Sequence, residues 1–213
     1  MESVKEGTYY SYERGEMLEF VPPHVRCVLD VGCGAGAFGS LLKKALGAEV
    51  WGVEINETAA QSAGEKLDKV LTGDINRMMA VIPEAYFDCV VFNDVLEHLV
   101  DPYTILLSMK KKLRRGGVIV CSLPNIRYYR QLRELVVHKQ WKYQDAGILD
   151  RTHLRFFTER SIKDMFQNLD FELILFKGMN PARSKNLRLL NALLLGALSD
   201  TRYPKFACVA RPK

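Results

Sequence analysis

The sequence lacks several features that would place it in other classes of protein. Its five cysteines (Cys27, Cys33, Cys89, Cys121 and Cys208) show no CxxC spacing, which argues against a disulfide framework or a zinc ribbon. No apolar run approaches the roughly 18 residues that a membrane span needs. The start, MESVKEGTYYSYERGE, is polar and mostly acidic, unlike a secretory signal or a basic transit peptide. Together these absences predict a reduced, cytoplasmic protein without a membrane span.

The charges are divided unevenly along the chain. Residues 1–100 carry 8 Lys and Arg residues against 16 Asp and Glu residues, whereas residues 101–213 carry 22 against 9. A basic second half suits a protein that binds an anionic substrate there. The alternative is that basic runs such as Lys110-Lys111-Lys112 are simply solvated faces of helices.

Apolar, β-branched runs alternate with helix-compatible stretches. The expected strands are Cys27–Val31, Val50–Glu54, Lys69–Leu71, Phe87–Phe92, Val118–Ser122, Phe171–Phe176 and Phe206–Ala210. Asn56, Asp101 and Thr158 are typical helix N-caps between them. The alternation predicts an α/β, doubly wound sheet in a single domain over residues 1–213. Residues 180–204 form an excursion between the last two strands, which we expect to be antiparallel.

Closely spaced glycines follow the first expected strand in the stretch VLDVGCGAGAFG, residues 28–39. Gly32, Gly34 and Gly36 lie at alternate positions, where backbone without Cβ atoms can approach a ligand at a strand-to-helix turn. The pattern GxGxxG begins at Gly34 and brings an NAD-dependent oxidoreductase into consideration. The register is poor for that ligand, because a count from Gly32 places Ala37 at the third glycine position.

Further motifs follow in order: VEIN, GDIN, FDCVVFNDVLEHL and LRRGGVIVCSLPN. With VLDVGCGAG, they resemble the class I S-adenosylmethionine-dependent methyltransferases, specifically the broad bacterial branch that often serves glycan, lipid or small-metabolite pathways. The resemblance covers roughly residues 9–178, including an N-terminal segment with Tyr9, Tyr10 and Arg14. It implies a seven-stranded, mostly parallel sheet with an antiparallel last strand, and S-adenosyl-L-methionine across the carboxyl ends of the strands.

The expected cofactor-binding residues follow from their places at strand ends. Asp30 can accept from the ligand's ammonium group or order the loop, and Glu54 suits the two ribose hydroxyls. Asp74 can reach the adenine amino group or cap a helix before Asn76. The full set is Asp30, Gly32, Gly34, Gly36, Glu54, Ile55, Asp74, Ile75 and Asn93.

Two of the four histidines are candidates for catalysis. His98 follows the fourth strand in the run Asp94-Val-Leu-Glu97-His98, and His153 lies in DRTHLRFFT. Glu97, His98 and His153 are therefore the expected catalytic residues, with a histidine as base or substrate hydrogen bonder. With Asp94 they also resemble the divalent-metal site of ubiquinone-pathway O-methyltransferases and small-RNA 2′-O-methyltransferases, although those families usually have glutamate at the position of Asp94. A packing role for the histidines stays open.

Residues 125–158 form an expected substrate lid insert that mixes basic and aromatic residues. Arg127, Tyr128, Arg130 and Arg133 are its candidate substrate-binding residues, because such a mixture can clamp phosphates and stack sugars or bases. An amphipathic lid helix is the alternative and is compatible with that role. The expected substrate is a small anionic metabolite or a sugar or glycan precursor, methylated on oxygen, with RNA as the alternative.

The stretch Leu187–Leu198, LRLLNALLLGAL, is apolar nearly all round. A helix of this kind has to be covered, and we expect the rest of the chain to cover it. A homodimer contact or a lipid-linked substrate is the alternative.

Overall fold

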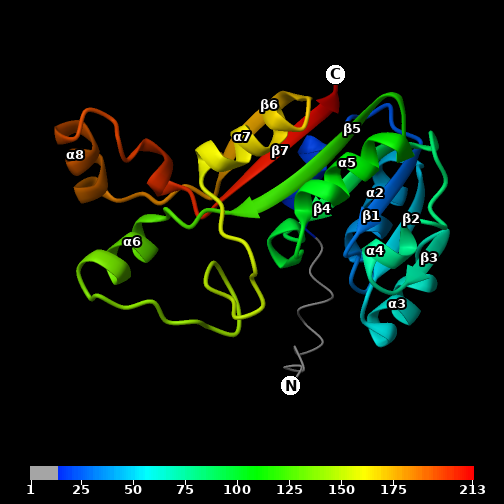
Figure 1. Ribbon diagram of the computed structural model, residues 1–213, viewed down its shortest axis with the longest axis horizontal. Coiled ribbons are helices and arrows are strands. Elements are labelled where there is room, and N and C mark those ends of the chain that lie inside the picture. Colours follow the sequence, from blue (N-terminus) through cyan, green and yellow to red (C-terminus); the bar gives the residue numbers. More distant parts are fainter. Residues whose placement is uncertain (1–13) are drawn as a thin grey trace.

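The computed structural model describes residues 14–213 and is built on a seven-stranded sheet (Figure 1). Its strands are β1 (Cys27–Val31), β2 (Glu49–Glu54), β3 (Lys69–Thr72), β4 (Phe87–Asn93), β5 (Leu113–Pro124), β6 (Phe171–Met179) and β7 (Lys205–Pro212). The order across the sheet is β3-β2-β1-β4-β5-β7-β6. Strands β1 to β5 are parallel, and β7 pairs antiparallel with both β5 and β6. The predicted fold class is confirmed.

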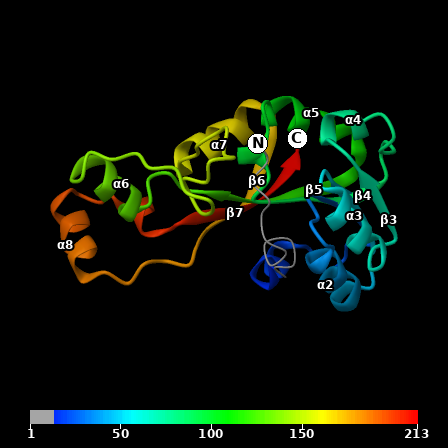
Figure 2. The ribbon, with the colours of Figure 1, turned by 90° about the horizontal axis from the view of Figure 1, so that it is seen from below.

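Helices cover both faces of the sheet, as Figure 2 shows. On one face lie α4 (Ile75–Met78), α5 (Pro102–Lys112) and α7 (Glu159–Asn168), and on the other η1 (Gly15–Phe20), α2 (Ala37–Leu46) and α3 (Glu57–Gly64). Alternate residues of a strand point to opposite faces, so that Leu29 packs into the first core and Val28 into the second. The runs look continuously apolar because both faces are buried.

The predicted helix caps are confirmed. Asn56, Asp101 and Thr158 each accept a backbone N–H of the following turn with a side-chain oxygen. The helix after Asn56 ends at Gly64. The remaining boundaries shift by a few residues, most of all in β5, which begins at Leu113.

Two segments extend past the end of the sheet. One contains α6 (Tyr129–Val136), and the other contains α8 (Lys185–Leu193) and η3 (Ser199–Arg202). Figures 1 and 2 both place α6 and α8 together, beyond the central sheet. Neither helix has a buried residue. The expectation that the chain covers Leu187–Leu198 is therefore wrong for residues 14–213, because no layer of the fold reaches past the sheet to pack on α8.

Two glycines give a stability test with opposite signs. A Cβ atom on Gly52 in β2 would lie 2.5 Å from Cys33 Sγ, whereas one on Gly64 in α3 would meet nothing within 4 Å. We expect Gly52→Ala to lower the free energy of unfolding by about 1–3 kcal/mol, because the added methyl group would overpack the core. Gly64→Ala should raise it by about 0.4–1 kcal/mol by reducing the freedom of the unfolded chain. Urea denaturation measures both, and equal effects would contradict this packing.

Candidate active site

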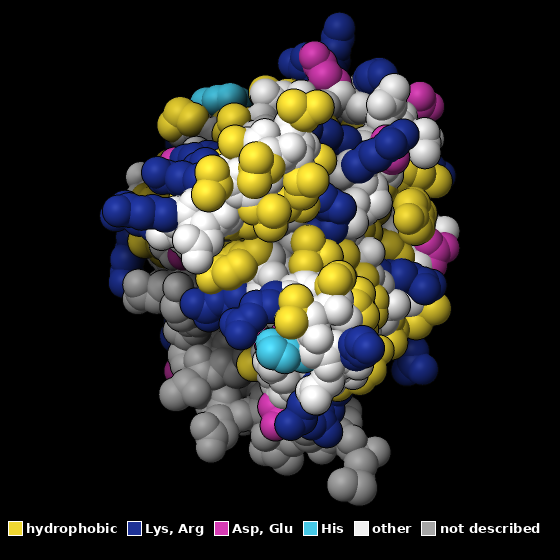
Figure 3. All heavy atoms as spheres, turned by 90° about the vertical axis from the view of Figure 1, so that its left-hand side faces the viewer, with side chains coloured by type: hydrophobic (Ala, Val, Ile, Leu, Met, Phe, Trp, Pro, Cys, Tyr) yellow, Lys and Arg dark blue, Asp and Glu magenta, His cyan; other side chains and the backbone are white. Residues whose placement is uncertain are grey.

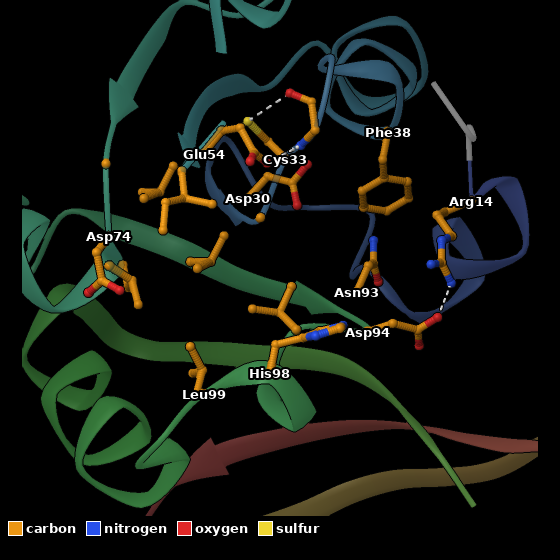
Figure 4. A pocket seen from close by; sticks show the side chains of 18 residues that line it. Arg14, Asp30, Cys33, Phe38, Glu54, Asp74, Asn93, Asp94, His98 and Leu99 are labelled. Atoms are coloured by element: carbon orange, nitrogen blue, oxygen red, sulfur yellow. Dashed lines mark hydrogen bonds and ion pairs between the residues drawn. The ribbon is translucent and has the colours of Figure 1, made fainter. Parts of the chain in front are cut away.

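A cavity of about 350 Å³ opens where β1, β2 and β4 end. The strand order reverses between β1 and β4, and ligands of open α/β sheets bind at such a switch point, beyond the carboxyl ends of the strands. Eight of the nine expected cofactor-binding residues line this cavity: Asp30, Gly32, Gly34, Glu54, Ile55, Asp74, Ile75 and Asn93. Figure 4 shows their side chains arranged around one space.

The glycine loop after β1 is tied to the end of β2. Gly32 N donates to Val53 O at 2.8 Å, and Gly34 N donates to Glu54 Oε2 at 2.8 Å. Both glycines have positive φ, and a Cβ on Gly32 would lie 2.6 Å from Val95 Cγ2. Only glycine fits this turn without strain, and the loop presents bare backbone to the cavity.

Glu54 is buried and has both carboxylate oxygens engaged by backbone. Oε1 accepts from Asn56 N at 2.9 Å, and Oε2 accepts from Gly34 N at 2.8 Å. Each oxygen of a carboxylate can accept a second hydrogen bond. The orientation of Glu54 is therefore fixed before a ligand arrives, and its remaining lone pairs suit a diol.

Asp30 lies next to Glu54 and is only 2% exposed. Burial, and then the charge of Glu54, raise the pKa of Asp30 to about 7, although Arg14 opposes the rise. A cationic ligand group in the cavity would favour the ionised form. Asp30 is therefore placed to ionise and pair with a positively charged ligand group near neutral pH.

Asn93, at the end of β4, presents an unsatisfied amide. Neither its Oδ1 nor its Nδ2 has a hydrogen-bond partner within residues 14–213, although both atoms are buried. Figure 4 places this amide beside Phe38, facing the same space as Asp30. A buried polar group without a partner costs stability, so a polar ligand group is its natural partner.

Asp74 lies at one end of the cavity and Arg14 at the other (Figure 4). Asp74 Oδ1 caps α4 by accepting from Asn76 N at 2.8 Å. The expected cap is therefore present, and Asp74 lines the cavity as well. Ile75 is buried, whereas Ile55 is 68% exposed at the mouth. These two side chains offer the apolar walls that a flat ring needs.

Asp94 follows Asn93 and faces two cations. Its carboxylate pairs with Arg14 and with Lys205 Nζ, the latter at 2.6 Å. Burial opposes ionisation, but Lys205 and Arg14 together hold the pKa of Asp94 well below its usual range. Asp94 is therefore ionised and forms an ion-pair network at the edge of the cavity.

His98 also lines the cavity. Its Nδ1 lies 3.2 Å from Thr152 O and 3.1 Å from Thr152 Oγ1. A carbonyl oxygen can only accept, which favours the tautomer with hydrogen on Nδ1 and a basic Nε2. Thr152 therefore holds this edge of the ring.

Glu97 and His153 form a buried pair behind His98. His153 Nε2 lies 4.0 Å from Glu97 Oε1, and the two imidazole centroids are 4.7 Å apart. Burial, and then the charge of Asp94, raise the pKa of Glu97 well above its usual value. Glu97 Oε2 has no hydrogen-bond partner in the described part of the chain. One donor atom from each of Glu97, His98 and His153 lies within 4.8 Å of the others, so these three could hold a cation. Asp94 is outside the group.

The remaining expected site residues lie away from the cavity. Gly36 is not among its lining residues. It packs tightly on Ala63 instead, since a Cβ atom on Gly36 would lie 3.0 Å from Ala63 Cα. None of Arg127, Tyr128, Arg130 and Arg133 lines it either. Arg127 Nε bonds Asp200 Oδ2 at 2.7 Å and so joins the two projecting segments. Tyr9 and Tyr10 lie outside the described residues.

Several lining residues lie inside the quoted motifs but are not among the expected site residues. Phe38, Gly73, Val95 and Leu99 shape the cavity. Apolar side chains beside a strand end look like ordinary core residues, and only their packing shows that they face a ligand space.

Comparison with known proteins agrees with this geometry. Residues 10–175 match a family described as "Methyltransferase domain". A ubiquinone biosynthesis O-methyltransferase of Cereibacter sphaeroides is 28% identical over 161 residues, covering 71% of this chain and 62% of that protein. A probable S-adenosylmethionine-dependent methyltransferase of Mycobacterium tuberculosis is 32% identical over 100 residues, covering 47% of this chain and 36% of that protein. The chain thus spans less than two thirds of the length of these relatives.

Among solved structures, an S-adenosylmethionine-dependent methyltransferase from Archaeoglobus fulgidus superposes with a TM-score of 0.71 at 22% identity. The match covers 96% of this chain and 94% of that one. The chain therefore belongs to the methyltransferase-domain family, with the class I S-adenosylmethionine-dependent fold. S-adenosyl-L-methionine is its cofactor, and the nicotinamide alternative is set aside.

The cavity fits that cofactor on two counts. The orphaned amide of Asn93 requires a polar partner, and Glu54 presents a fixed carboxylate with free accepting capacity toward ribose hydroxyls. Asp30 suits the ammonium group, and Asp74 with Ile55 and Ile75 suits the adenine. These individual roles remain predictions.

The role of Glu54 is tested by removing its carboxylate. Glu54→Ala should weaken binding of S-adenosylhomocysteine by about 1–3 kcal/mol, because a charged hydrogen-bond partner is lost. Glu57→Ala, an exposed acid at the start of α3, is the matched control and should bind normally. Calorimetric titration measures both, and unchanged affinity of Glu54→Ala would remove this residue from the site.

The raised pKa of Asp30 makes cofactor binding depend on pH. Between pH 6 and pH 8 Asp30 ionises, so a ligand ammonium should bind about tenfold more tightly at the higher pH. The unliganded protein should lose stability between about pH 4 and pH 7, because over that interval the folded state keeps a proton on Asp30 that the unfolded chain has already released.

Calorimetric titrations with S-adenosylhomocysteine between pH 6 and pH 8 should show the gain in affinity in wild type and in His98→Gln, but not in Asp30→Asn. A gain that persists in Asp30→Asn would assign the titrating group elsewhere.

Proposed function

We propose that this protein transfers the methyl group of S-adenosylmethionine to a hydroxyl oxygen of a small anionic acceptor, with His98 as the base. The observation that carries the proposal is the position of His98, which lines the same cavity as Asp30, Glu54 and Asn93. When bound, the cofactor supplies an electrophilic methyl group on sulfur. The residues of the chain have to hold the acceptor in line and receive its proton.

The described geometry supports a proton-accepting role for His98. Thr152 holds Nδ1, which favours a basic Nε2 on the other edge of the ring. A base must come within about 3 Å of the acceptor hydroxyl or reach it through one water. Holding the two reacting groups in line accounts for much of the expected rate enhancement.

A metal-assisted form of the same reaction is favoured by one specific observation. Glu97, His98 and His153 bring one carboxylate and two imidazoles together, and Glu97 Oε2 lacks a partner among the described residues. A divalent cation held there would reverse the raised pKa of Glu97, since the charge of an ion dominates its site. It would also acidify a hydroxyl bound to it.

The acceptor class is inferred from charge. Arg14 and Lys205 lie at the edge of the cavity around Asp94, and residues 101–213 carry 22 basic against 9 acidic residues. A positive field of this kind raises the local concentration of anions. Phosphorylated or nucleotide-linked sugars are therefore the first acceptors to test. The relatives named ubiquinone biosynthesis O-methyltransferase support oxygen as the methylated atom.

The role of His98 is tested by truncating it. His98→Ala should lower turnover about a hundredfold or more, because general base catalysis is lost, while S-adenosylhomocysteine still binds. His138→Ala, an exposed histidine of the insert, is the matched control and should leave turnover unchanged. Methyl transfer from labelled cofactor measures the rate, and calorimetry measures the binding.

The outcomes separate the two forms of the proposal. Loss of activity in His153→Ala and on EDTA treatment, with rescue of the treated wild type by divalent ions, indicates the metal-assisted form. Full activity of both His98→Ala and EDTA-treated enzyme would overturn the roles given to these histidines.

A further inference from the structure

The projecting end of the molecule exposes an unusual number of apolar side chains. We call it the tip surface and define it by Leu135, Val136 and Val137 with Leu189, Leu190, Leu193, Leu194 and Leu195, each at least 45% exposed. Figure 3 looks at this end and shows hydrophobic side chains gathered over it, with Lys and Arg side chains around them. Large exposed apolar patches on a protein mark interaction surfaces.

Leu195 is the most exposed residue of the tip surface. Its side chain is 97% exposed and its φ is 50°, a left-handed conformation that costs energy for leucine. Asn or Gly would satisfy the same turn with less strain. Leu195 is almost fully exposed and so gains little from packing within residues 14–213, and a contact outside the described chain would offset the strain.

The surroundings of the apolar side chains are strongly basic. Residues 125–149 and 180–204 carry nine Lys and Arg residues and three Asp and Glu residues. Two of the three acids are engaged, because Asp200 pairs with Arg127 and Asp145 with Arg151. Arg183, Lys185 and Arg188 are exposed and lie at the start of α8. A partner that matches the tip surface would be both apolar and negatively charged.

A small cavity of about 90 Å³ under α8 adds a polar element. Arg188 and Arg202 line it together with Ser184, which caps the helix by accepting from Leu187 N at 3.3 Å. Two guanidinium groups and hydroxyl-bearing side chains suit a phosphate-bearing headgroup. The cavity lies beside the exposed leucines of the same helix.

A second copy of the chain does not match this surface. A two-fold contact places the same patch on both subunits, so the basic rims would face each other and repel. An anionic bilayer offers the matching chemistry, since apolar side chains enter the acyl boundary while Lys and Arg meet the headgroups. No helix within residues 14–213 is long and apolar enough to cross a membrane, which leaves attachment to the surface.

We propose that the tip surface docks the protein on the surface of a membrane that contains anionic phospholipid. The leucines of α8 and of the turn after it insert at the interface, and the surrounding Arg and Lys side chains bind the phosphate groups. This attachment does not depend on the proposed function.

Sedimentation with vesicles tests the attachment. The full chain should bind vesicles of equal amounts of phosphatidylcholine and phosphatidylglycerol, and should bind phosphatidylcholine vesicles at least tenfold more weakly. The variant L189Q/L193Q/L195N removes the apolar contact, while its Asn at position 195 suits the left-handed turn. The variant R183Q/K185Q/R188Q removes three charges and should weaken binding on the order of a hundredfold.

Matched controls change exposed residues elsewhere. V81Q/L107Q/I174Q and K44Q/K111Q/R115Q should bind anionic vesicles like wild type, and all variants should keep the affinity of wild type for S-adenosylhomocysteine. Equal binding to both kinds of vesicle, or equal losses in the controls, would overturn the proposal. Absence of vesicle binding with a dimer in light scattering that L189Q/L193Q/L195N abolishes would also overturn it, and would assign the surface to a second copy.

Discussion

The site depends on one carboxylate that joins two strands. Glu54 accepts from Gly34 N with one oxygen and from Asn56 N with the other, so it ties the loop after β1 to the turn that starts α3. The parallel pairing of β1 with β2 brings these segments together, and the positive φ of Gly32 and Gly34 lets the loop turn without strain. Because both bonds are made to backbone, the carboxylate is oriented before any ligand binds. A ligand can bind to a preorganised acceptor of this kind without further ordering of the chain.

The loop after β4 separates two carboxylates that lie three residues apart in sequence. Asp94 faces Lys205 and Arg14, which hold its pKa well below the usual range although burial opposes this. Glu97 is buried next to His153, and burial together with the charge of Asp94 raises its pKa well above the usual value. Neighbouring groups with oppositely shifted pKa values are typical of sites that carry out proton transfer or bind ions. Asp94 therefore forms ion pairs at the edge of the cavity, whereas Glu97 lies beside His98 and His153.

The sequence predicted the parts of the structure that local chemistry decides. The positions of the strands along the chain, the helix caps and the place of Glu54 at a strand end follow from apolar periodicity and from side chains that can cap or accept. It could not show that Thr152 contacts His98, because His98 and Thr152 lie 54 positions apart and meet only when residues 125–158 fold back. The same holds for Arg127, whose partner Asp200 belongs to another segment. The exposure of α8 was also beyond prediction, since an apolar helix normally signals burial, and its surroundings depend on where the fold ends.

The central claim is that the cavity at the ends of β1, β2 and β4 binds S-adenosylmethionine rather than a dinucleotide. Isothermal titration of the full chain with S-adenosylhomocysteine and with NAD, in parallel and in one buffer, tests it most directly. The account predicts one molecule of S-adenosylhomocysteine bound per chain with micromolar or tighter affinity, and no measurable heat with NAD. Binding of NAD with equal affinity, or no binding of S-adenosylhomocysteine by folded protein, would contradict it.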